Sequence, residues 1–208
     1  SIHKILIAFG IALILYSLFS FRLHHFIILL VLGAIAFLYS FPFLPFRNKK
    51  RIKDFGLLKI ITLALLWTLV TVWFPADRGN FTGLSFQLIF LRRFIFMFIL
   101  CLLFDIRDTE IDRQQNIATL SVMLGIKRSY ILCYILLIIF VLLSVIQFIH
   151  IPDAVQLITM LISAAATLIT IEFSKKNNSD FIYLACIDGM MLLQAALVIF
   201  TSSIQNGQ

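Results

Sequence analysis

Seven apolar stretches, each close to the length that crosses a lipid bilayer, dominate this sequence. They lie near residues 5–21, 26–46, 55–75, 84–104, 129–149, 154–173 and 181–201. A transmembrane helix needs about 20 such residues. Because 62% of the 208 residues are hydrophobic and only 13% are charged, a soluble domain is excluded. We expect an all-α polytopic membrane helix bundle of about seven transmembrane helices, forming a single domain over residues 1–208.

The basic residues are unevenly distributed over the loops between these stretches. If the loops alternate between two sides, 13 of the 17 Lys and Arg residues lie on one side, two lie on the other, and two lie within a span. Positively charged loops are retained in the cytoplasm, so we expect residues 47–53 and 105–128 to be cytoplasmic. The net charge of +7 then reflects topology and attraction to anionic lipid, and no nucleic-acid partner is expected.

An acidic cluster directly follows the fourth apolar stretch. Asp105, Asp108 and Asp112 are spaced i, i+3 and i+7, so on a helix they fall within about 60° of one another. Glu110 and Arg107 point elsewhere. Carboxylates at the mouth of a membrane helix are costly without a cation, and Mg²⁺ prefers a few carboxylates together with substrate phosphate oxygens. The spacing therefore favours a Mg²⁺ site that holds a diphosphate.

Three stretches carry a family resemblance. Residues 104–125 contain D-x-x-D-x-x-x-D-R, then Thr-Leu and V-x-L-G; residues 38–51 contain Tyr-Ser-x-Pro before a basic loop; residues 187–194 read Ile-Asp-Gly-Met-Met-Leu-Leu-Gln. In this order and spacing the sequence resembles the UbiA-type intramembrane prenyltransferase superfamily, with residues 104–125 as its second Asp-rich motif. The resemblance covers essentially the whole chain and implies helices three to nine of a nine-helix prenyltransferase.

The sequence also departs from the family pattern. The first Asp-rich motif, N-D-x-x-D-x-x-x-D, and the two helices before it are missing, so we expect either an N-terminally incomplete chain or a divergent subgroup. Asn116 stands where Gly is usual, Ala118 where Lys is usual, and Ser121 where Pro is frequent. With one Asp cluster and one cation fewer, we expect these 208 residues alone not to turn over prenyl diphosphate at a useful rate.

The resemblance implies an enzyme, a transferase of alkyl or aryl groups other than methyl. It would move a prenyl group from a polyprenyl diphosphate, with Mg²⁺, to a hydrophobic acceptor that is aromatic or otherwise lipid-like, as in quinone biosynthesis. We expect an integral protein of a bacterial inner membrane with the Asp motif facing the cytoplasm. The implied catalytic and metal-binding residues are Asp105, Asp108 and Asp112; the candidate substrate-binding residues are Tyr39, Arg47, Lys50, Arg51 and Arg113.

Other interpretations remain open. The chain can be a non-catalytic relative that binds prenyl diphosphate or lipid, or a small membrane transporter in which Arg92, Arg93 and Asp188 line a path. The Asp cluster can be an acidic interfacial loop paired with nearby Lys and Arg side chains, and Tyr39 can be an interfacial aromatic anchor. Because charges inside a membrane are usually paired, we expect an Arg93–Asp188 pair in helix packing or at an acceptor pocket.

Overall fold

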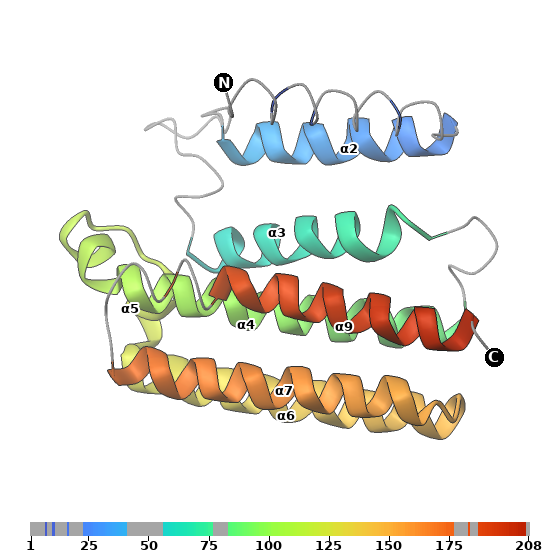
Figure 1. The fold of residues 1–208 in the computed structure, drawn as a ribbon. Coiled ribbons are helices and arrows are strands. Elements are labelled where there is room, and N and C mark those ends of the chain that lie inside the picture. The colour runs from blue at the N-terminus through green and yellow to red at the C-terminus, as the bar shows by residue number, and fades with distance from the viewer. Residues whose placement is uncertain are drawn as a thin grey trace.

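The computed structural model describes residues 7, 10, 16, 23–40, 56–76, 83–176, 183 and 187–206. Its helices are α2 (Leu23–Ser40), α3 (Gly56–Thr68) with a π-helical continuation η2 (Leu69–Trp73), α4 (Leu84–Gln114), α5 (Leu120–Leu124), α6 (Ile126–His150), α7 (Ala154–Lys176) and α9 (Asp188–Asn206). No strand occurs in these residues, which confirms the all-α prediction. Helix α4 packs against α3 and α6, while α7 packs against α6 and α9 (Figure 1).

The outer surface of the bundle is apolar, and many hydroxyl side chains are turned inward. Helix α7 buries one stripe of small polar residues, made of Thr159, Ser163, Thr167, Thr170 and Ser174. Small residues let membrane helices approach closely, and Thr167 also donates to the Ser163 carbonyl oxygen at 2.8 Å. On the outer surface of the bundle the exposed side chains are apolar; those of α6 include Ile131, Ile135, Ile138, Leu142 and Ile149. This distribution suits a bundle surrounded by lipid.

The predicted spans and the observed helices agree in part. Among the described residues, three segments are long and apolar enough to cross a membrane: Gly56–Trp73, Ile126–His150 and Ala154–Lys176; His25–Ser40 and Asp188–Thr201 are apolar but shorter. The predicted span at 181–201 contains most of α9, and its described residues before α9, Tyr183 and Ile187, are π-helical. The predicted span at 5–21 lies outside the described residues except for isolated positions.

Helix α4 does not end where its apolar residues end. It continues without a break through the Asp motif to Gln114, so the apolar stretch and the motif belong to one continuous helix. The chain turns out of the helix at Asn116, whose φ is +55°, with Asn116 N–H donating to the Arg113 oxygen at 3.2 Å and Ile117 N–H to the Asp112 oxygen at 2.9 Å. This Schellman arrangement requires a left-handed residue, usually Gly and sometimes Asn. The Asn116 departure therefore preserves the backbone conformation that a Gly would supply.

The first residue of α3, Gly56, touches the loop that follows the Asp motif. A Cβ atom at this position would overlap the Ala118 carbonyl oxygen and the Thr119 Cα atom. Only glycine allows two backbones to approach this closely. The contact fixes the start of α3 against the loop after α4 and places Lys59, about one turn further along α3, beside the Asp motif.

We predict that Gly56→Ala destabilises the protein, because the added methyl group meets backbone atoms that cannot rotate away. The cost is expected to be about 1–3 kcal/mol or more, measured as a lower thermal unfolding midpoint in detergent with a dye that reacts with the buried Cys133. The control is Gly33→Ala on α2, where a Cβ meets nothing within 4 Å. Equal midpoints for the two variants would contradict the proposed backbone contact.

Candidate active site

The acidic residues of α4 separate into buried and exposed positions, as helical periodicity predicts. Asp105 and Asp112 are buried, with 1% and 8% of their surface accessible, whereas Glu110 is exposed. Two carboxylates on one buried face of a single helix, at the end of the bundle that carries α5, form the centre of the candidate site (Figure 1).

The short helix α5 fixes Asp105 from one side. The Ser121 N–H donates to Asp105 Oδ2 at 3.0 Å, and the Ser121 hydroxyl donates to the Asp105 backbone oxygen at 2.8 Å. The family pattern described above often has proline at position 121. Proline has no N–H, so the first of these hydrogen bonds could not form. The serine thus ties the loop after α4 back onto the first aspartate of the motif.

Lys59 of α3 lies between the two buried aspartates. Its Nζ is 3.4 Å from Asp105 Oδ1 and 4.0 Å from Asp112 Oδ2. No sequence motif marks this lysine, although one signal exists: it is a lone charge near the start of an apolar stretch, and such charges are usually paired or functional. The ammonium group compensates part of the negative charge that the two carboxylates bring into the bundle.

Asp112, which lies beyond the apolar part of α4, is incompletely compensated. Its Oδ2 is buried without a hydrogen-bond partner. Burial raises the pKa of the Asp112 carboxyl above its usual value; the negative charge of Asp105 adds to the rise, and Lys59 opposes it. Because its charged form is destabilised, this carboxylate is stabilised by any additional cation nearby.

The structure does not bring the other motif residues into this pair. Asp108 accepts hydrogen bonds from its neighbour Arg107 at 2.7 and 3.2 Å, and the same guanidinium group stacks over the rings of Phe104 and Tyr183. Arg113 is exposed and 3.4 Å from Glu110. Their roles in substrate or metal binding stay predictions.

The remaining candidate residues lie before α3. Tyr39 is half-buried near the end of α2, which lies at the same end of the bundle as α5 (Figure 1). Arg47, Lys50 and Arg51 lie outside the described residues.

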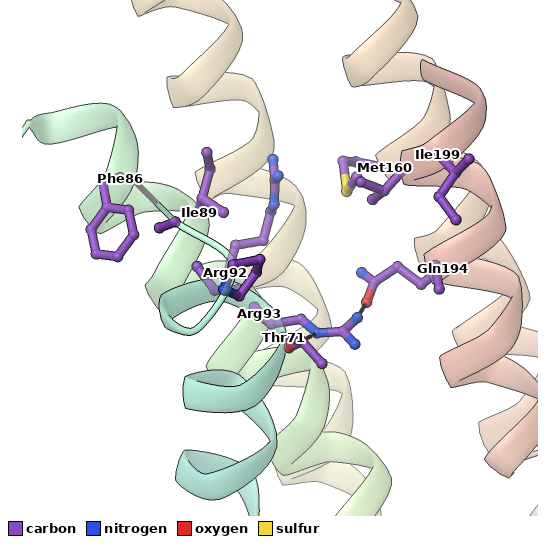
Figure 2. A pocket seen from close by; sticks show the side chains of 13 residues that line it. Thr71, Phe86, Ile89, Arg92, Arg93, Met160, Gln194 and Ile199 are labelled. Carbon is purple, nitrogen blue, oxygen red and sulfur yellow. Dashed lines mark hydrogen bonds between the residues drawn. The ribbon is translucent and has the colours of Figure 1, made fainter. Parts of the chain in front are cut away.

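The expected Arg93–Asp188 pair is wrong. Arg93 instead donates from Nε to the Thr71 hydroxyl at 3.1 Å and from Nη1 to Gln194 Oε1, as Figure 2 shows. Asp188 is the exposed first residue of α9. An exposed carboxylate is solvated by water, so Asp188 does not need a buried arginine.

Asp105 and Asp112 fit one mode of Mg²⁺ binding. Among the described residues, no group of three His, Cys, Asp or Glu side chains lies close enough to hold a metal ion. However, Mg²⁺ is commonly held by one or two carboxylates, with substrate phosphates and waters completing its octahedron. The unpartnered Asp112 oxygen and the carboxylate chemistry of the pair suit that mode, in which the phosphate arrives with the metal.

A helical membrane bundle with buried carboxylates at one end defines an integral membrane protein with a charged site at its edge. The family model described as the UbiA prenyltransferase family matches residues 2–197. The chain therefore belongs to the UbiA prenyltransferase family. No match to it was found among curated proteins or among solved structures.

We predict that Lys59→Gln destabilises the protein at neutral pH by about 1–3 kcal/mol, because two buried carboxylates lose their cation. Without Lys59 the pKa of Asp112, already raised, rises further. The penalty is then present while Asp112 is charged and is lost as the pH falls through the raised pKa. Thermal midpoints of variant and wild type should therefore converge as the pH is lowered from neutral through the raised pKa of Asp112.

The matched control is Lys127→Gln, which changes an exposed lysine at the start of α6. Its midpoint should follow that of the wild type at every pH. A Lys59→Gln deficit that stays constant across this pH range would show that the lysine contributes packing and not charge compensation.

Proposed function

We propose that this protein transfers a prenyl group from a polyprenyl diphosphate, with Mg²⁺, to an aromatic or lipid-like acceptor. One observation carries the proposal beyond family membership: Asp105 and Asp112 lie buried on one face of α4 and converge on Lys59. Opposite charges are thus gathered where the apolar part of the bundle ends, which is where an amphiphile with a diphosphate head and an apolar tail would place its head.

The chemistry requires stabilisation of a leaving group. When the bond between the allylic carbon and oxygen breaks, its electron pair stays with the pyrophosphate, and positioned cations stabilise the added negative charge. Mg²⁺, when bound, supplies most of that charge. Asp105 is oriented by Ser121 and Lys59, and Asp112 offers an oxygen, Oδ2, that accepts no hydrogen bond and is only 4.0 Å from the Lys59 ammonium group. The Lys59 ammonium, 25% exposed, is the protein cation best placed to donate hydrogen bonds to phosphate oxygens.

The charges at this end support a cytoplasmic orientation in a bacterial inner membrane. The described basic residues on α3, on α6 and α7, and around the Asp motif are Lys59, Arg107, Arg113, Lys127, Arg128, Lys175 and Lys176. These positions belong to the end of the bundle that carries α5 (Figure 1). An excess of Lys and Arg marks the cytoplasmic side of membrane proteins, so a water-soluble diphosphate head would approach from the cytoplasm.

A second candidate is a non-catalytic relative that binds prenyl diphosphate or lipid. The Lys59 contacts favour it, because the aspartate pair is already partly neutralised without a metal ion. The transporter hypothesis has less support, since Arg93 is satisfied by neutral partners and Asp188 is exposed. Metal-dependent binding of prenyl diphosphate without product, for every acceptor tested, would favour the non-catalytic relative.

We predict that Asp105→Asn and Asp112→Asn each abolish Mg²⁺-dependent binding of radiolabelled farnesyl diphosphate and lower any turnover by at least about 100-fold, which corresponds to about 2.7 kcal/mol of transition-state stabilisation. Glu110→Gln is the matched control, because this acidic residue of the same helix is exposed and points away from the pair. Binding is measured in nanodiscs with Mg²⁺ or with chelator. Equal sensitivity of all three positions would remove the case for a metal-facing pair.

We also predict opposite topologies for the two ends of α6. Arg128 and His150 are both exposed, and the 22 helical steps from one to the other rise about 33 Å, enough to cross a hydrocarbon core. After removal of the native cysteines, Arg128→Cys should react with an impermeant thiol reagent only in inside-out vesicles, and His150→Cys only in intact cells. The reverse pattern would place the Asp motif outside the cytoplasm.

A further inference from the structure

A second polar site lies inside the bundle, away from the Asp motif. A cavity of about 540 Å³ opens between η2, α4, α7 and α9. Apolar side chains form most of its wall, among them Phe86, Ile89, Met160 and Ile199 (Figure 2). Two adjacent arginines, Arg92 and Arg93, line it. Arg92 lies 13 residues before Asp105 on α4, which is about 20 Å along the helix, so the cavity is separate from the candidate active site.

The two arginines differ in how they are satisfied. Arg93 donates to Thr71 and Gln194 and lies over the Phe96 ring at 5.5 Å. Arg92 is only 5% exposed, and within the described part of the chain it makes no hydrogen bond, ion pair or ring contact. A buried guanidinium group inside a membrane protein costs several kcal/mol when it has no counter-charge. Among the residues that the structure describes, this cation has no counter-anion.

The polar groups that line the cavity favour a ligand with a negative charge. Its described lining contains two positive charges and no carboxylate. Gln194 accepts from Arg93 through Oε1, which leaves its amide N–H groups as donors, and Figure 2 shows this side chain reaching from α9 toward Arg93. The cavity wall is mostly apolar, and its hydrogen-bond donors come from Arg92, Arg93 and Gln194. This combination suits a ligand with one anionic head and an apolar body.

We propose that this cavity binds the carboxylate head of a single-chain amphiphile, with the Arg92 guanidinium as its counter-charge. A planar guanidinium group matches a carboxylate through two parallel hydrogen bonds. The volume lies in the range of pockets that hold one medium-sized ligand, whereas a diacyl phospholipid brings two long chains. The site uses none of the residues assigned to prenyl diphosphate, so it is independent of the proposed function.

The test measures binding of tritiated dodecanoate to the protein in phosphatidylcholine nanodiscs at about pH 8.5, without Mg²⁺ or prenyl diphosphate, with empty nanodiscs subtracted. Saturable binding is expected for the wild type and for Lys127→Met, an exposed lysine at the other end of the bundle. Arg92→Met should weaken binding at least ten-fold. It is expected to fold, because it replaces an unpaired buried charge with an apolar side chain of similar length.

Competition on the wild type tests the head group without any mutation. Unlabelled dodecanoate should displace the probe, whereas dodecanol and methyl dodecanoate, which lack the charge, should not. No saturable binding, equal affinity in Arg92→Met, or displacement by dodecanol would each overturn the proposal. Stronger displacement by phosphatidylglycerol than by dodecanoate would overturn the carboxylate assignment in favour of a lipid phosphate.

Discussion

The carboxylate of Asp105 joins three helices, and the functional end of the bundle depends on it. It extends from α4 and accepts one hydrogen bond from the Lys59 ammonium group of α3 and another from the Ser121 N–H of α5. Because this carboxylate is almost completely buried, each donor is needed to offset the cost of removing a charge from water. The same contacts that hold α3 and α5 in place therefore orient the residue expected to act on substrate.

Helical periodicity separated Glu110 from the three motif aspartates, of which Asp105 and Asp112 are buried and Asp108 is half-buried. The 100° step separates Asp105 and Asp112 from Glu110, and the structure places them accordingly. Asp108, about 60° from Asp105, lies at the edge of that face, where the adjacent Arg107 engages it. Lys59 stood out in the sequence only as a lone charge near the start of an apolar stretch, and its pairing with Asp105, 46 residues later, is a tertiary contact that the sequence did not predict. Its position follows from the close approach of Gly56 to the loop after α4.

Hydropathy predicted several of the apolar helices that the structure describes, but not where each helix ends. The apolar pattern of α4 ends near residue 104, yet the helix continues to Gln114, because backbone hydrogen bonding does not require apolar side chains. The helix stops where Asn116 adopts a left-handed conformation and reverses the chain. The prediction of an Arg93–Asp188 pair was wrong because it rested on opposite charge alone. In the structure Arg93 donates instead to the neutral Gln194.

The unbroken continuation of α4 has an electrostatic consequence for the motif. A helix carries about half a negative elementary charge at its C-terminal end, and all three motif aspartates lie in the last three turns of this 31-residue helix. Carboxylates are normally avoided there, since the dipole opposes them. The end of α4 therefore concentrates negative potential from both its backbone and its side chains, and a cation that reaches this end is attracted by the whole helix as well as by Asp105 and Asp112.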